Sequence, residues 1–213
     1  GGINTPLVNE KDQINVVQHY IPDAAIPLLS KYINYWKVNL VIAPKRITKH
    51  GDFRILPNGI HRISVNNSSN PYRFLITLIH EIAHLVAFKN FGYSIKPHGK
   101  EWKSCYQKLM IPFLNSKIFP KDLLNLLTFH LKNPRASTDV DFNLVIELNK
   151  FDPKTEKNYI FELDLGTIFE TDNGRKFVKG FKRKKRYECD EVSTRRRYFF
   201  SPHARVKRIE RNG

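Results

Sequence analysis

Apolar residues recur every three or four positions over a long stretch in the first half of the chain, between Asn70 and Gly92. This spacing is typical of one buried face of a helix. Asn70 followed by Pro71 favours a helix start, because Asn accepts hydrogen bonds from the first backbone N–H groups and Pro has no N–H to leave unpaired. Gly92 favours an end. The pattern therefore predicts one long buried helix, with the apolar positions Phe74, Leu75, Leu78, Ile79, Ile82, Leu85 and Val86.

Shorter stretches with the same spacing predict four further helices, at residues 10–20, 21–36, 100–110 and 121–131. Three runs rich in β-branched and apolar residues lie before the long helix, at residues 38–42, 51–56 and 60–65. A Pro-Asn-Gly turn separates the last two of these runs, as in a hairpin. The first part of the chain is therefore predicted as an α+β domain, with helices around a small, mostly antiparallel sheet.

The spacing of apolar residues changes from helix-like to strand-like after Pro134, where we place the end of this domain. We predict a first domain at residues 1–133, a linker at 134–140 and a second domain at 141–213. The stretch from Leu144 to Leu148 reads as a strand. From Phe161 onward, short β-like runs alternate with turn signals, which predicts a small β-rich, barrel-like domain. The expected strands are at 144–148, 161–165, 167–170, 176–179, 186–189, 197–200 and 204–209.

The positive charge of the chain is concentrated in this second domain. The whole sequence has a formal net charge of +16, and the stretch from Gly174 to Gly213 holds 15 Lys and Arg against 4 Asp and Glu. Basic runs interleaved with aromatic residues suit phosphate contacts and base stacking, so we expect a nucleic acid partner, DNA in particular, bound with low sequence specificity. The alternative is a solvated basic surface whose aromatics fill the core. The candidate contacts are Lys182, Arg183, Lys184, Lys185, Arg186, Arg195, Arg196 and Arg197.

Two cysteines far apart, Cys105 and Cys189, do not form a disulfide framework and fit a reducing compartment. No unbroken apolar run approaches 18 residues, and no signal peptide is visible, so neither a transmembrane helix nor a membrane partner is expected. These features predict a cytoplasmic protein.

The candidate chemistry lies inside the long helix, in the motif His80-Glu81-Ile82-Ala83-His84. Two histidines four residues apart share one face of a helix, where their imidazoles can bind one divalent metal ion. Glu81 is turned aside, within reach of a water molecule on that metal. His98, fourteen residues further on, is the candidate third ligand, since a catalytic zinc has three protein ligands and one open position. The alternative is a buried helix whose histidines match by chance.

After His98 the sequence continues Gly99-Lys100-Glu101-Trp102, and a second stretch, Arg46 to Gly51, precedes the long helix. With these motifs the chain resembles the SprT-like metallopeptidases, which include the Spartan proteases, over roughly residues 20–111. The resemblance implies a zincin-like fold and an edge strand that receives an extended peptide. It implies zinc held by His80, His84 and His98, with Glu81 as the catalytic base. It also implies protein substrates associated with DNA, including DNA–protein crosslinks, and hence a role in DNA repair.

The chain departs from that family in one respect. Many members carry a C-terminal zinc ribbon with paired Cys-x-x-Cys motifs, whereas Cys189 is the one cysteine in this part of the chain. A four-cysteine site is therefore excluded. Two functions stay open at this point: a zinc-dependent endopeptidase, or a nucleic-acid-binding module with a non-catalytic metal site. Three ligands accompanied by Glu81 favour the enzyme, because a structural zinc normally has four protein ligands.

Overall fold

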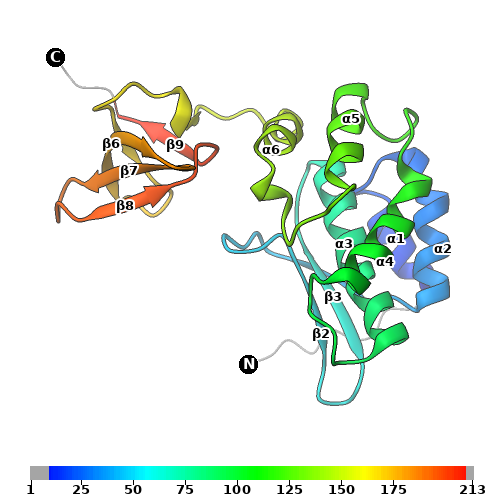
Figure 1. The fold of residues 1–213 in the computed structure, drawn as a ribbon. Helices are drawn as coiled ribbons and strands as arrows, with labels where there is room; N and C mark the ends of the chain where they lie inside the picture. The colour runs from blue at the N-terminus through cyan, green and yellow to red at the C-terminus, as the bar shows by residue number, and fades with distance from the viewer. Residues whose placement is uncertain (1–9, 210–213) are drawn as a thin grey trace. The chain divides into compact units, whose positions relative to one another are not determined.

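The computed structural model describes residues 10–209, and in them the chain is α+β, as the sequence predicts (Figure 1). The chain divides into two units between Pro153 and Lys154. The predicted linker at 134–140 was wrong as a boundary, because the helix that follows it packs in the first unit.

The first unit surrounds a mixed three-stranded sheet. Its strand order is β1-β3-β2, with β3 parallel to β1 and antiparallel to β2. The prediction of a mostly antiparallel sheet missed the parallel pair, which arises because β3 inserts between β1 and β2. Strand β2 is therefore an edge strand. The elements of this unit are α1 (Glu10–Val17), α2 (Ile26–Trp36), β1 (Leu40–Ala43), β2 (Gly51–Ile55), β3 (His61–Asn66), α3 (Pro71–Phe91), α4 (Lys100–Met110), α5 (Lys121–His130) and α6 (Phe142–Asn149), with 3-10 turns at Asp23–Ala25, Ile111–Phe113 and Thr138–Val140.

Helix α3 is the centre of the first unit and confirms the predicted long helix. The side chain of Asn70 accepts hydrogen bonds from the backbone N–H groups of Tyr72 and Arg73, both at 3.2 Å. The helix packs against α4 and against strands β2 and β3. By length and composition alone α3 could also cross a membrane, which the lack of an unbroken apolar run did not predict. A core helix meets the same criterion, and 61% of the most apolar window of α3 is buried in the unit.

Residues 142–149 form helix α6, so the strand predicted from Leu144 to Leu148 was wrong. A short apolar run does not by itself distinguish a strand from a buried helix. Here Asp141 decides the outcome, because its side chain caps the helix by accepting from the Leu144 N–H at 3.3 Å. Leu144, Val145 and Leu148 are all buried, at helical spacing. The predicted second domain therefore loses residues 141–153 to the first unit.

The second unit is a six-stranded antiparallel sheet in the order β4-β9-β5-β6-β7-β8. This confirms a β-rich C-terminal part from residue 158 onward, although the expected strand at 161–165 is replaced by a 3-10 turn. The strand order is linear, so closure into a barrel stays a prediction. The strands are β4 (Asn158–Tyr159), β5 (Ile168–Glu170), β6 (Lys176–Arg183), β7 (Arg186–Glu191), β8 (Arg197–Phe200) and β9 (Arg205–Arg208), and the core residues are Ile160, Leu163, Phe169, Phe177, Cys189 and Val206.

Candidate metal centre

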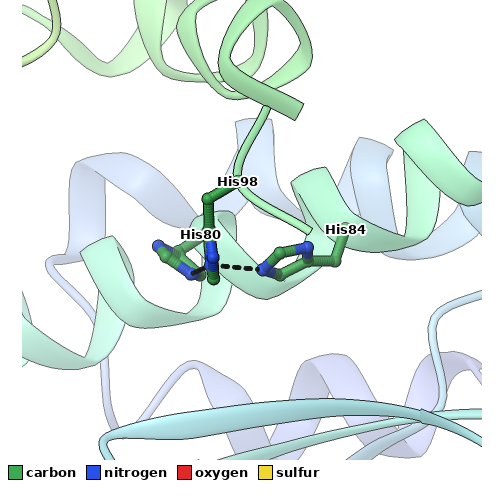
Figure 2. A group of neighbouring side chains, drawn as sticks. All are labelled: His80, His84 and His98. Atoms are coloured by element: carbon green, nitrogen blue, oxygen red, sulfur yellow. Dashed lines mark hydrogen bonds between the residues drawn. The ribbon is translucent and has the colours of Figure 1, made fainter. Parts of the chain in front are cut away.

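Three histidines converge at the middle of α3 (Figure 2). His80 and His84 are one turn apart on α3, and His98 approaches from the loop that leads into α4. The Nε2 atom of His98 lies 3.0 Å from Nε2 of His84 and 3.3 Å from Nε2 of His80. The structure thus brings together the three histidines that the sequence predicts as ligands, although His84 and His98 are 14 positions apart in the sequence.

The geometry and protonation of this cluster fit a metal ion. Ligand nitrogens about 2.0–2.1 Å from a tetrahedral ion lie about 3.3 Å from one another, close to the spacings seen here. Burial, with a further contribution from the neighbouring imidazoles, holds the pKa of His80 well below its usual range. Burial also lowers the pKa of His84 to about 3 and depresses the pKa of His98. All three imidazoles therefore favour the neutral form, which is the form that binds a metal.

The cluster rests on an aromatic floor from α4. The ring of Trp102, which is fully buried, lies 4.7, 5.3 and 4.8 Å from the rings of His80, His84 and His98. Its indole N–H donates to the backbone carbonyl oxygen of His80 at 3.3 Å. Tyr106 stacks beneath Trp102 at 5.0 Å. Trp102 and Tyr106 together limit the rotation of the imidazoles. Of the two, only Trp102 was predicted from the sequence to pack beneath the metal site.

Glu81 lies beside the histidines, with Oε1 at 3.9 Å from Nε2 of His80. Its side chain is buried, and burial raises the pKa of its carboxyl to about 8 in the metal-free protein, with a smaller contribution from the negative charge of Asp52. Arg46 and Lys49 partly offset this rise. A carboxyl with such a pKa can both take and return a proton near neutral pH.

Strand β2 passes directly over Glu81, and Gly51 makes this approach possible. A Cβ atom at Gly51 would lie 2.7 Å from Cγ2 of Thr77, 3.0 Å from Cγ of Glu81 and 3.1 Å from its Oε1. A side chain at position 51 would therefore collide with the methyl group of Thr77 and press against the side chain of Glu81. Neither Gly51 nor Thr77 was predicted as a functional residue, since only the folded chain brings β2 onto α3.

An open cleft of about 530 Å³ contains the centre. Strand β2 and the loop after α3 line it, and so do residues 136–139, which the sequence assigned to a linker. His50, just before β2, pairs with Asp139, Nε2 to Oδ2 at 3.0 Å, across 89 residues of chain. The predicted linker thus lines the cleft, and this contact holds it in place.

The predicted nucleic acid residues lie in the second unit. Lys182 and Arg183 end β6, Arg186 begins β7, and Lys184 and Lys185 form the turn between them. We call residues 182–186 the basic hairpin. Four of them, residues 183–186, line a hollow of about 470 Å³ together with Phe199.

The other basic run, residues 195–197, is partly paired with acids. Arg197 lies 3.3 Å from Glu188 and 3.1 Å from Asp190. The aromatics also divide into two sets. Tyr187, Tyr198 and Phe200 pack against the core, whereas Phe181 and Phe199 are exposed, at 72% and 50%. Phe181 was not among the aromatics that the sequence singled out.

Comparison with known proteins gives one match. Residues 42–119 match the model of the SprT-like family. This segment runs from within β1 to two residues before α5, so it contains β2, Glu81 and all three histidines. No curated protein and no solved structure matches the chain.

Proposed function

We propose, on the premise that residues 42–119 match the SprT-like family, that the chain is a zinc-dependent endopeptidase of zincin-like fold. The observation that carries this proposal is the meeting of three imidazoles and a buried carboxyl in one open cleft. His80, His84 and His98 would hold the zinc. Three protein ligands leave a coordination position free, as catalytic zinc sites require.

Zinc bound there would lower the pKa of a water molecule to about 7 and polarise a peptide carbonyl. The residues of the chain supply the rest of the chemistry. Glu81 accepts a proton from the attacking water and passes it to the departing amine, for which a carboxyl with a raised pKa is well matched. Trp102 keeps His80, His84 and His98 in place from below.

The substrate would be an unfolded protein segment. Strand β2 pairs with β3 on one side, and its other edge lines the cleft. An extended peptide can add to this edge through main-chain hydrogen bonds, which presents its carbonyl groups to the metal centre. We propose proteins associated with DNA, including DNA–protein crosslinks, as the natural substrates, in a cytoplasmic setting.

The alternative is a nucleic-acid-binding module whose metal has no catalytic part. Cleavage of an unstructured protein with and without a chelator separates the two, with Glu81→Gln as the matched variant. We expect the parent to cleave, the chelator to stop it, and Glu81→Gln to bind one zinc per chain without cleaving. Cleavage by Glu81→Gln at the parent's rate would contradict the role of Glu81. A parent that binds zinc and cleaves nothing would favour the module.

We propose nucleic acid as the partner of the second unit, with phosphates held by the basic hairpin and bases stacked on the exposed aromatics. The hairpin gathers five cations within five residues. Phe199 lines the same hollow as four of them, and Phe181 lies on β6 just before the hairpin tip. Base stacking on such rings is tolerant of sequence, which agrees with binding of low specificity.

A salt titration of binding to single- and double-stranded DNA tests this partner. Replacing Lys184, Lys185 and Arg186 with Ala should weaken binding and reduce the salt slope by about two to three, since each lost phosphate contact removes about 0.7–0.9. The matched control replaces three exposed lysines elsewhere: Lys31, Lys117 and Lys154. No binding by the parent at low salt, or an equal loss in the control, would contradict the proposal.

A further inference from the structure

The cleft has two chemically different ends. At one end the charged groups already have partners: Asp52 pairs with Lys49 at 2.8 Å and with Arg54 at 2.7 Å, and His50 pairs with Asp139. The other end is apolar. It is lined by Phe53, Ile55, Ala87, Phe88, Tyr93, Ile95 and Pro97, and we call it the aromatic subsite.

The aromatic subsite begins at the metal centre itself. The ring of Phe53 lies nearly parallel to that of His84, 7° apart with centroids at 6.5 Å. Phe88 follows at 6.2 Å from Phe53, and Tyr93 at 4.6 Å from Phe88. Three aromatic rings thus lead outward from one candidate ligand. Tyr93 forms the rim, with 78% of its surface exposed.

The same strand carries both the approach to Glu81 and the start of the subsite. Gly51 lies against Glu81, and Phe53 is two residues further along β2, about 6.6 Å away at the usual strand rise. A peptide added to the edge of β2 has the same rise. When its scissile carbonyl is at the metal centre, a side chain one or two residues away therefore lies over the rings.

We propose that the aromatic subsite selects a large apolar side chain, such as Phe, Leu or Met, within two residues of the scissile bond. This rests on the proposed peptidase function. No residue that lines the subsite is charged. The neighbouring imidazole of His61 packs against Phe53 and Phe88, and burial lowers its pKa, so it favours its neutral form. A substrate Asp, Glu or Lys would therefore lose its hydration there without gaining a charged partner. An apolar side chain would instead leave water. Apolar pockets of this kind discriminate by about 10- to 100-fold.

Cleavage of a random peptide mixture by the full zinc-loaded chain, followed by sequencing of the products, tests the proposal. We expect one position within two residues of the cut to be enriched in large apolar residues by about tenfold or more. Tyr93→Ala and Phe88→Ala should each reduce that enrichment several-fold. Tyr35→Ala is the matched control, because Tyr35 is 77% exposed and lies on α2, outside the cleft.

The outcomes separate the two proposals. A parent that cleaves no peptide contradicts the peptidase function. A parent that cleaves without apolar preference overturns the aromatic subsite and leaves the peptidase standing. An equal loss of preference in Tyr35→Ala also overturns it. Phe88 is half-buried. If Phe88→Ala does not fold, Tyr93→Ala on the exposed rim tests whether the aromatic subsite selects the apolar side chain.

Discussion

Replacing Gly51 with Ala should displace the catalytic base without touching a metal ligand. The added carbon would lie 2.7 Å from Cγ2 of Thr77 and 3.0 Å from Cγ of Glu81. Carbon atoms in good contact are about 3.5 Å apart or more, so the two neighbours must yield by about 0.8 and 0.5 Å. The backbone at Gly51 does not have a positive φ, so alanine itself is not strained there.

The expected size follows from these displacements. Inserting a methyl group into a packed site costs about 1–3 kcal/mol, and we expect the lower part of that range because an edge strand can move outward. A misplacement of about 1 Å costs about 100-fold in rate, so a shift of about half as much at Glu81 should lower kcat/KM by about tenfold. Zinc content should not change.

The assay measures kcat/KM on an unstructured peptide, zinc by elemental analysis, and the free energy of unfolding. Thr77→Ser supplies the control, because it removes the one methyl group that the new carbon meets most closely. Adding Thr77→Ser to Gly51→Ala should restore most of the stability and leave the contact with Glu81. Parental kcat/KM in Gly51→Ala would refute the argument that β2 positions the base, and loss of zinc would assign the effect to the ligands instead.

Three further predictions concern the metal centre. His98→Ala should lower zinc content well below one per chain after dialysis, whereas His19→Ala, an exposed histidine on the first unit, should not; full zinc in His98→Ala would exclude His98 as a ligand. In the metal-free protein, the contribution of Glu81 to the free energy of unfolding should fall by about 2 kcal/mol between pH 6.5 and 8, because folded Glu81, with a pKa of about 8, keeps a proton that the unfolded chain has lost; the cluster histidines, whose pKa values are depressed in the folded chain, offset part of this fall. Glu81→Gln should remove this fall, and a fall of the same size in that variant would assign it elsewhere. At lower pH the histidines dominate, because their depressed pKa values in the folded chain make the unfolded chain take up protons first, so the stability of the metal-free protein should also fall as the pH drops below about 6, as measured by denaturant unfolding.

The parts of the fold that the sequence predicted are those with local signals. Helix α3 begins at Pro71 after its Asn70 cap and ends before Gly92, and α4 has the predicted bounds. The pairing of His80 with His84 follows from helical geometry alone. His98 was placed beside them by its motif, and the fold agrees because the loop after α3 is short.

The parts that the sequence missed depend on contacts between distant residues. The contact of Gly51 with Glu81 and the pair of His50 with Asp139 exist only after β2 and residues 136–139 have packed on α3. Alternation along β6 would place Phe181 on the same face as Phe177, inside the core. A register shift between Lys179 and Lys182 turns it outward, which no period-two pattern shows.

The cap of α3 has a consequence for the order of events during synthesis. The Asn70 side chain also donates to the backbone carbonyl oxygen of Leu148 at 2.9 Å and to Asp152 at 3.0 Å. Leu148 lies 78 residues after Asn70, so at about 5–20 residues per second it leaves the ribosome some 4 to 16 s later. All three histidines are synthesised before Leu148. Until then, α3, which carries two of them, lacks the hydrogen bonds from Asn70 to Leu148 and Asp152. Translation therefore completes the candidate metal ligands before it completes the residues that hold the N-terminus of α3. A nascent chain paused before α6 would expose the histidines on a helix that lacks these contacts.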